Sequence, residues 1–280
     1  MIPIIDCHCH VYPAKVAARA VASIGRFYHL DMCLDGTVET LKREGGKAGI
    51  DHFVIFSVAT SPSQVSPINR FIAETAARSG GCMTGLGTLH PESDDPERDV
   101  EEILKLGLKG VKLHHDFQGF GIDDRRCMRL YEICEGRLPV LMHTGDNRYD
   151  YSNPNRLKPV LEAFPGLTVI GAHLGGWSIW EQAANELCGF GNFYVDSSSS
   201  LYALTPEKAK ELIRMYGADR VLYGDDFPMW PPAEELERFR KLGLTEQEQE
   251  LILCRNAEKI FGIRLSNKDG GQTPADQRET

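Results

Sequence analysis

Eight short apolar runs, evenly spaced along the chain, restrict the fold more than any other feature of this sequence. Most are near-continuous stretches of valine, isoleucine, leucine and phenylalanine, which is the composition of strands buried on both faces in a parallel sheet. From the second run on, the starts lie 24 to 31 residues apart, close to the length of one strand plus one helix. The runs are Ile4–His10, Asp51–Ala59, Cys82–His90, Leu108–His115, Pro139–Gly145, Thr168–Gly175, Asn192–Ser198 and Arg220–Pro228.

Helical patterns lie between these runs, so strands and helices alternate. The clearest are Asp95–Leu106, Asp123–Gly136, Thr205–Tyr216 and Thr245–Phe261. The last of these opens with a threonine and a glutamate in capping-box spacing, which is typical of a helix start. Eight strand–helix units predict an α/β fold of the (β/α)8 TIM-barrel type, for which roughly 250 residues are usual. An open, doubly wound sheet is the competing fold.

The domain organisation follows from the same pattern. We expect one barrel domain over residues 1–265, which includes a C-terminal helix, and a disordered polar tail over 266–280. The segment Val11–Thr37, between the first two runs, is longer than a simple connection. It is predicted to form a lid or an extra helix over the site.

Composition and charge narrow the class of function. The net charge is −9, and no cluster of basic residues is longer than Arg125–Arg126, which argues against nucleic-acid binding. No apolar run reaches the ~20 residues of a membrane span, and Asp6 and His8 interrupt the N-terminus before a signal peptide could form. Eight cysteines without a CxxC pair predict reduced thiols in a cytoplasmic protein. These features favour an enzyme for small molecules, with no nucleic-acid or membrane partner.

The histidines are concentrated where a barrel enzyme keeps its active site. Only His29 and His52 lie elsewhere. The other seven lie toward the C-terminal ends of predicted strands, the end that carries the active site in such barrels. These seven are His8, His10, His90, His114, His115, His143 and His173.

Two histidines of the first strand are placed to share a ligand. Residues two apart on a strand point to the same face, so His8 and His10 can reach one point in space. The same alternation predicts that Cys7 and Cys9 face the helix layer. The alternative is a pair of polar residues at a strand end with no ligand.

Further candidate ligands end later strands. His143 and His173 each end an apolar run and have a glycine two residues later, which leaves room for a ligand near the backbone. Asp226 ends the eighth run, which lies beside the first strand in a closed barrel. Three imidazoles and one carboxylate suit Zn²⁺, with Mn²⁺, Fe²⁺ or Co²⁺ as alternatives. The histidines could instead be core residues, and one of Asp225 and Asp226 a helix cap or turn residue.

Taken together, these motifs resemble the amidohydrolase superfamily. The matching segments are Ile5–Pro13, Pro139–Gly145, Ala172–Gly176, Gly224–Pro228 and Asn256–Gly262. The resemblance spans roughly residues 4–262. It is closest to the amidohydrolase-related branch (amidohydrolase 2), which includes aminocarboxymuconate semialdehyde decarboxylase and related hydrolases. Dimers are common in that branch, so the resemblance also points to a homodimer.

The resemblance implies a role for each matching residue. His8, His10 and His143 resemble ligands of one divalent metal ion, most simply Zn²⁺, with Mn²⁺ as the alternative. Asp226 resembles a fourth ligand or a proton carrier, and His173 a catalytic residue that acts on the metal-bound water.

Lys112 departs from the mononuclear pattern. In binuclear superfamily members, a carboxylated lysine near the end of the fourth strand bridges two metals, so Lys112 is such a bridge, a clamp for a substrate carboxylate, or a lysine that reaches solvent. Periodicity leaves open whether Lys112 and His114, or Val111 and His115, point inward. The other candidate substrate contacts are His114, Tyr12, Trp177, Asp146 and Arg148.

The function expected first is a metal-dependent hydrolase of an amide, ester or lactone, in which metal-activated water attacks a small substrate. The alternative is a metal-dependent, non-oxidative decarboxylase of a small carboxylated, possibly aromatic, compound. A third hypothesis is a barrel that binds a ligand without catalysis. The sequence has no GxSxG motif, which disfavours a serine hydrolase.

Overall fold

A closed ring of parallel strands forms the centre of the molecule. The computed structural model describes residues 2–265. Each strand pairs in parallel with the next in two sheets, ordered β1-β2-β3 and β4 to β9. The strands are β1 (Ile5–His10), β2 (His52–Phe56), β3 (Met83–Gly85), β4 (Gly87–Thr88), β5 (Val111–Leu113), β6 (Val140–Met142), β7 (Val169–Gly171), β8 (Phe193–Asp196) and β9 (Val221–Leu222).

Two junctions close the ring and decide between the two predicted folds. At Leu86, between β3 and β4, the backbone N–H donates to the Ile55 carbonyl of β2, and the next N–H, of Gly87, donates to the Gly110 carbonyl before β5. At the other junction, the His10 N–H donates to the Phe227 carbonyl at 2.8 Å. The barrel prediction is therefore confirmed, with the third strand interrupted once.

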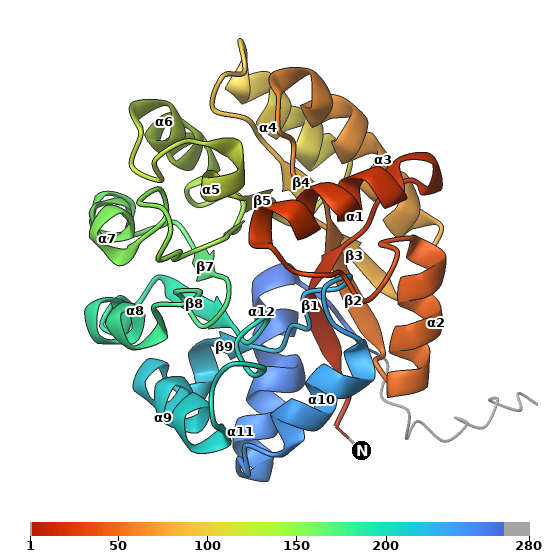
Figure 1. Ribbon diagram of the computed structural model, residues 1–280. Helices are drawn as coiled ribbons and strands as arrows, with labels where there is room; N and C mark the ends of the chain where they lie inside the picture. The colour runs from red at the N-terminus through yellow and green to blue at the C-terminus, as the bar shows by residue number, and fades with distance from the viewer. Residues whose placement is uncertain (1, 266–280) are drawn as a thin grey trace, which may run out of the picture.

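Helices surround the ring (Figure 1), and the four helices predicted from periodicity are present. The segment predicted as one helix over 245–261 has a π-helical stretch, Leu251–Arg255, between two α-helices, and its capping box is formed. The outer helices are α2 (Val38–Ala48), α3 (Val65–Ala77), α4 (Pro96–Lys105), α6 (Arg125–Cys134), α7 (Pro154–Ala163), α8 (Trp180–Leu187), α9 (Pro206–Tyr216) and α10 (Pro232–Arg240), followed by α11 (Glu246–Glu250) and α12 (Asn256–Phe261).

The long segment after β1 contains an extra helix, as predicted. Helix α1 (Ala14–Tyr28) precedes α2 and belongs to none of the strand–helix repeats. Figure 1 shows it in front of the strands, across β4 and β5. The short helix α5 (His115–Gln118) follows β5 directly.

The interior of the barrel is a small apolar core of its own. It contains buried apolar residues from several strands, including Val54, Leu141 and Leu222, together with Leu86 between β3 and β4. It continues into the C-terminal segment through Cys254, Ala257 and Phe261. Cys7 belongs to this core, whereas Cys9 packs with the outer helices. The prediction that both thiols face outward is therefore wrong for Cys7, because a register irregularity between Asp6 and Cys9 breaks the alternation.

The cysteines, the possible membrane helices and the C-terminal tail were also predicted from the sequence. All eight cysteines are free thiols, in agreement with the reduced state expected from their spacing. Within residues 2–265, no helix is long and apolar enough to cross a membrane. The tail predicted over 266–280 lies outside the described residues.

Candidate metal centre and active site

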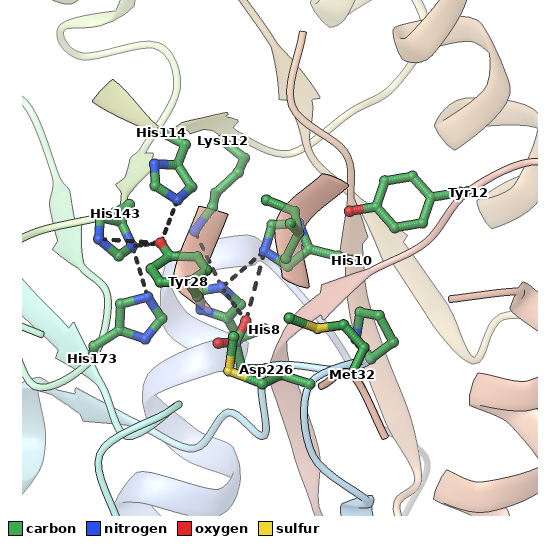
Figure 2. A pocket seen from close by; sticks show the side chains of 13 residues that line it. His8, His10, Tyr12, Tyr28, Met32, Lys112, His114, His143, His173 and Asp226 are labelled. Carbon is green, nitrogen blue, oxygen red and sulfur yellow. Dashed lines mark hydrogen bonds and ion pairs between the residues drawn. The ribbon is translucent and has the colours of Figure 1, made fainter. Parts of the chain in front are cut away.

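Five of the seven strand-end histidines line one small cavity at the C-terminal end of the barrel (Figure 2). Its volume is about 30 Å³, which leaves room for an ion and a few waters but not for an organic molecule. His90 and His115 lie outside it. The titratable residues that line it are His8, His10, Tyr12, Tyr28, Lys112, His114, His143, His173 and Asp226.

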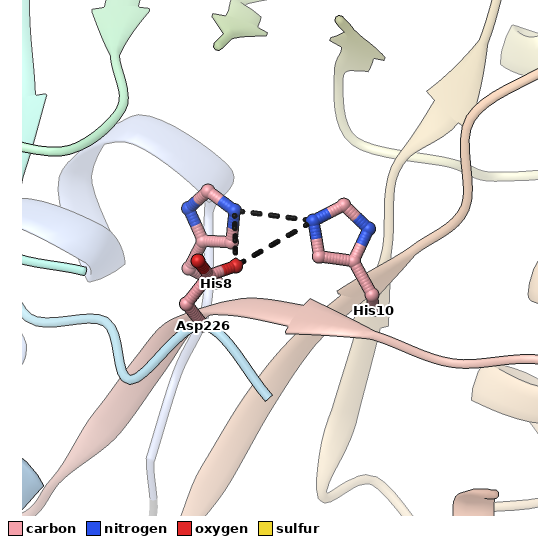
Figure 3. A group of neighbouring side chains, drawn as sticks. All are labelled: His8, His10 and Asp226. Atoms are coloured by element: carbon pink, nitrogen blue, oxygen red, sulfur yellow. Dashed lines mark hydrogen bonds and ion pairs between the residues drawn. The ribbon is translucent and has the colours of Figure 1, made fainter. Parts of the chain in front are cut away.

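Three of the predicted metal ligands converge on one side of this cavity (Figure 3). The Nε2 atoms of His8 and His10 are 3.3 Å apart. Asp226 Oδ1 lies 3.3 Å from the first and 3.7 Å from the second. One ligand atom from each residue therefore faces a common point. The closure of the barrel, which sets the end of β9 beside β1, brings the carboxylate there.

The tautomer of His8 shows that this group suits a cation. His8 Nδ1 lies 2.8 Å from Asp196 Oδ2, an acceptor, so the ring proton belongs on Nδ1. Nε2 then presents a lone pair to the Asp226 oxygen. Two electron-rich atoms at this distance need a positive charge between or beside them, as in carboxylate–histidine–metal arrangements. The donor set therefore fits a divalent ion. Lys112 Nζ, 3.2 Å from the same nitrogen, adds a further positive charge.

The other two histidines form a facing pair. His143 Nε2 lies 3.1 Å from the Gly145 carbonyl, and His173 Nδ1 lies 3.0 Å from the Ser198 carbonyl, so both of these nitrogens carry the proton. The remaining nitrogens, His143 Nδ1 and His173 Nε2, are 2.9 Å apart and both present lone pairs. This pair therefore requires a shared proton or a bound cation. His143 borders the same cavity as the three convergent ligands but faces His173.

Burial keeps the ligand histidines neutral, the form that binds metal. Loss of solvation is the largest cause lowering the pKa of His8, His10 and His143 well below the ordinary value, and the charge of Lys112 lowers it further. Burial also lowers the pKa of His173 to about 4. It lowers the pKa of Lys112 to about 8, against the opposing effect of nearby carboxylates.

Strained backbone turns place the later site residues. His173 and Asp226 have φ values of 62° and 65°, in the left-handed region, and Leu174 and Ser199 lie there too. Each such residue costs about 1–3 kcal/mol unless the surroundings impose it. These residues are concentrated at the strand ends, which indicates that the surrounding structure imposes the strained turns in order to position the site residues.

Asp225 is the structural member of the acidic pair. Its Oδ1 accepts the Phe227 N–H at 2.6 Å, and its own N–H donates to Asp6 Oδ1. The turn role that the sequence allowed for one of the two aspartates therefore belongs to Asp225. Burial raises the pKa of both Asp6 and Asp225, and the hydrogen bond from the Asp225 N–H to Asp6 braces the ends of β1 and β9.

The structure answers the open question about the fourth strand. Lys112 and His114 line the cavity, whereas Val111 packs into the outer core and His115 Nε2 lies 2.7 Å from the Tyr131 hydroxyl of α6. The inward pair is therefore Lys112 and His114.

Of the other predicted substrate contacts, one lines the cavity and the rest lie outside it. Tyr12 lines it. Trp177 is not among its lining residues and packs edge-on against Tyr28, with 5.1 Å between ring centroids. Asp146 and Arg148 bind each other through an ion pair of 2.7 Å.

Comparison with known proteins places this arrangement in a family. The profile described as amidohydrolase matches residues 5–263. The chain belongs to the amidohydrolase family. A 2-amino-3-carboxymuconate-6-semialdehyde decarboxylase from Dictyostelium discoideum is 24% identical over 243 residues. That match covers 70% of this chain and 66% of the relative, slightly less than two thirds of its length.

Solved structures share the barrel. An uncharacterized TIM-barrel protein from Bordetella bronchiseptica is 26% identical, with a TM-score of 0.77 and coverage of 93% of this chain and 98% of its own. A 5-carboxyvanillate decarboxylase from Sphingomonas paucimobilis is 17% identical, with a TM-score of 0.72 and coverage of 94% and 100%. A dihydroxybenzoic acid decarboxylase from Polaromonas, solved with manganese and 2-nitroresorcinol, is 16% identical, with a TM-score of 0.71 and coverage of 95% and 98%. At these low identities the last two show the fold alone.

The amidohydrolase-family site includes one aromatic residue that the sequence argument missed. Tyr28 ends α1, and its hydroxyl lies 2.6 Å from His114 Nε2 and 3.3 Å from His143 Nδ1. His114 Nδ1 accepts the Phe117 N–H, so Nε2 carries the proton and donates it to the tyrosine oxygen. The Tyr28 proton is then free for His143 or a substrate. The only sequence signal was the predicted lid segment that contains it.

Arg148 fastens this end of α1 over the site. Its Nη1 donates to the Phe27 carbonyl at 2.7 Å, and its guanidinium lies over the rings of Tyr28 and Trp177, 5.2 Å from each centroid. The pair with Asp146 orients it. Residues predicted as substrate contacts thus hold the lid that carries Tyr28.

Two other missed residues support the histidines. Asp196 accepts from His8, and Ser198 bonds to Asp196 and lies 2.9 Å from His173 Nδ1. A carboxylate at the end of the seventh apolar run was a signal that could have identified Asp196.

Gly145 brings the loops after β6 and β7 together, and its substitution is expected to be costly. It has a φ of 75°, and a Cβ there would lie 2.5 Å from the Gly176 Cα. The space beside it is therefore filled by backbone and not by a ligand, contrary to prediction. Gly145→Ala should lower the free energy of unfolding by about 3 kcal/mol, measured by urea denaturation, because left-handed strain and overpacking add.

Gly119→Ala is the matched control for this prediction. Gly119 has a φ of 79°, but a Cβ there would meet nothing within 4 Å. Only the conformational cost of about 1–2 kcal/mol applies. Equal losses in the two variants would show that the contact with Gly176 is unimportant.

His115 should make stability depend on pH. Burial is the largest cause that lowers its pKa to about 3 in the folded protein, against an ordinary value of about 6.5. Between these values the unfolded state binds one proton more, so stability falls as pH falls from 6.5. Between pH 7.5 and 5.5, the His115→Gln variant should therefore lose about 1 kcal/mol less unfolding free energy than the wild type. The measurement is urea denaturation at the two pH values in the presence of a chelator. An equal loss of stability in the variant and the wild type would contradict the lowered pKa of His115.

Proposed function

We propose that this amidohydrolase-family enzyme is a metal-dependent, non-oxidative carboxy-lyase that releases CO₂ from a small carboxylated, aromatic or unsaturated compound. The observation that carries the proposal is Lys112, which is 1% exposed and borders the candidate metal centre. No described carboxylate lies within ion-pair distance of its ammonium group. A buried cation without such a partner is suited to a substrate carboxylate.

The relatives favour this proposal over hydrolysis, which the sequence alone put first. Aminocarboxymuconate semialdehyde, 5-carboxyvanillate and dihydroxybenzoate decarboxylases all occur among the similar proteins. The substrates of these proteins are candidate substrates for this chain. The curated relative supports a carboxy-lyase, and the two solved decarboxylases show that the same fold can carry this reaction class.

His8, His10, His143 and Asp226 would hold the metal ion. Three imidazoles and one carboxylate suit Zn²⁺, and Mn²⁺ is the alternative because a related structure contains manganese. When bound, the ion supplies a Lewis acid that holds substrate oxygens and stabilises negative charge.

The chain's own residues supply the proton that decarboxylation requires. The reaction breaks the bond between the substrate carbon and its carboxylate, leaves the electron pair on that carbon, and adds one proton there. Asp226 is placed to take up a proton from solvent and pass it to that carbon, since Oδ1 faces the cavity while Oδ2 accepts the Ser199 hydroxyl at 2.5 Å. Trp230 donates to the same hydroxyl at 2.9 Å, which fixes the direction of the carboxyl group.

Lys112, His114 and Tyr28 would orient the substrate. The ammonium group binds the departing carboxylate until its charge is lost with the carbon–carbon bond. Tyr28 offers its free proton to a substrate oxygen and, as part of α1, excludes water from the cavity. Tyr12 and Trp177 are proposed to shape the surroundings of the substrate, the latter through Tyr28.

Hydrolysis is the second candidate, and the pair His143–His173 favours it. The Nε2 atom of His173 is unprotonated and buried beside the centre, so it can accept a proton from water. Asp226 would then take up that proton and return it to the leaving group. This reaction consumes water and releases no CO₂.

Isotopes distinguish the two reactions. The tag-free protein, loaded with Zn²⁺ or Mn²⁺, would be given carboxylated phenols and unsaturated acids, and separately amides and lactones, in D₂O and in H₂¹⁸O. We expect CO₂ in equal amount to an organic product that carries one deuterium on carbon and no new ¹⁸O. An organic product with ¹⁸O and no CO₂ would instead establish the hydrolase.

The setting of the enzyme is also proposed. The eight free thiols suit a reducing compartment, so we place it in the cytoplasm. A homodimer is the assembly we expect, and sedimentation analysis would determine it. The partner is a small-molecule substrate, with no nucleic acid or membrane.

A further inference from the structure

A second and much larger cavity lies between α1 and α3. Its volume is about 530 Å³, and it shares His10, Tyr12, Ile24 and His114 with the cavity of the metal centre. The cavity of the metal centre has room only for the reacting group of a substrate. The rest of an organic substrate must therefore extend into an adjoining space, and this cavity adjoins the centre.

The walls of this α1–α3 cavity are largely apolar. Val16, Ala20 and Ile24 repeat every fourth residue along α1, so they lie on one face of that helix. Ile68 and Phe71 of α3 face them across the cavity. Volumes of 300–1,000 Å³ with such walls are typical of pockets that bind small molecules. The walls suit a hydrocarbon or aromatic segment.

The charge of the cavity is opposite to that of the protein. The chain has a net charge of −9, yet the described residues that line the cavity include Arg19 and Arg26 and no carboxylate. Neither arginine has an ion-pair partner among residues 2–265. Both are exposed, which places them at the outer edge of the cavity. Two guanidinium groups at the edge of a cavity in an acidic protein attract an anionic group.

We propose that the α1–α3 cavity is the specificity pocket, and that the substrate has two acidic ends. One carboxylate reacts at the metal centre, an apolar body fills the cavity, and a second anionic group binds Arg19 and Arg26. This inference rests on the proposed function because it assumes that the reacting end lies at the metal centre. It adds a substrate class: organic acids with a second anionic group separated from the first by an apolar segment.

Hydroxamates of different length test each part of the pocket. Acetohydroxamate binds a metal centre alone, octanohydroxamate adds an apolar tail, and the monohydroxamate of suberic acid adds a terminal carboxylate to a tail of the same length. Titration calorimetry on the metal-loaded protein should show at least tenfold tighter binding of octanohydroxamate than of acetohydroxamate. The suberic compound should bind at least threefold tighter again.

Variants assign these gains to particular side chains. Ala20→Trp, which fills the cavity, should remove the gain from the tail and leave acetohydroxamate binding unchanged. The matched control is Ala22→Trp, an exposed position on α1 that does not line this cavity. Arg19→Gln with Arg26→Gln should remove only the gain from the terminal carboxylate, whereas Lys15→Gln on the same helix should retain it.

The outcomes separate the two proposals. Failure of acetohydroxamate to bind the metal-loaded wild type would overturn the metal centre, and with it the inference that depends on that centre. Normal acetohydroxamate binding with no gain from a tail, or a gain that Ala20→Trp leaves intact, would overturn the specificity pocket alone. Equal affinity of the neutral and anionic tails would overturn the assignment of the two arginines.

Discussion

Replacing His8 and His10 together by alanine is expected to leave the protein without its metal ion. The wild type, purified without an affinity tag, should contain about one equivalent of Zn²⁺ or Mn²⁺ by plasma mass spectrometry, and the double variant less than about a tenth of that. Two of the four proposed ligands are lost, and His143 and Asp226 are too few to hold a divalent ion tightly. Activity should fall by at least about a thousandfold, because the Lewis acid is lost with the metal.

His90→Ala is the control for metal content. His90 also ends a strand but does not line the cavity of the metal centre, so this variant should keep the full equivalent of metal. No metal in the wild type, even after reconstitution, would contradict the proposed centre. Two equivalents would instead make Lys112 a bridging ligand and the facing pair His143–His173 the second site.

Replacing Asp226 by asparagine is expected to stop catalysis at a different step. Measured at saturating metal, kcat should fall about a thousandfold, because the amide retains the hydrogen bond from Ser199 but cannot transfer a proton. Bound substrate should still be detected by calorimetry. A variant that keeps more than about a tenth of the wild-type kcat would show that another group carries the proton.

Ser199→Ala distinguishes proton transfer from placement of the carboxyl group. It removes the hydrogen bond to Asp226 Oδ2 and leaves the acid in place. We expect about a tenfold loss of kcat, the order of magnitude of one hydrogen bond, and a shift in the pH profile of kcat. A loss as large as that of Asp226→Asn would mean that the role of the aspartate depends entirely on its orientation.

Helix α1 contributes both to the candidate active site and to the proposed specificity pocket. Tyr28 reaches the cavity only because α1 ends there, and Arg148 holds that end through the Phe27 carbonyl. The proposed specificity pocket lies along the same helix. One segment outside the strand–helix repeats therefore covers the reacting groups and forms a wall of the cavity that we expect to select the substrate.

Much of this site could be predicted from local sequence because a barrel is built from repeated local units. Polar residues at or near the ends of four runs face the centre, and His8, His10, His143, His173 and Asp226 were all identified by their position in such a run. Parallel strands in a closed ring carry those ends to one face. The amidohydrolase-family resemblance rests on the same residues, so it adds family knowledge and not a separate geometric observation.

The tertiary structure decided what depends on contacts between distant segments. An irregularity of strand pairing turned Cys7 into the barrel interior, and the pairing of β5 with its neighbours turned Lys112 inward and His115 toward α6. Hydrogen bonds to the Asp196 carboxylate and to the Ser198 carbonyl selected the tautomers of His8 and His173, and the path of α1 brought Tyr28 to the site. The sequence by itself determined which residues reach the end of the barrel, because the apolar periodicity of one strand fixes where that strand ends. Facing partners, protonation and the shape of the substrate cavity were decided only when the ring closed, because each depends on atoms far apart in the chain.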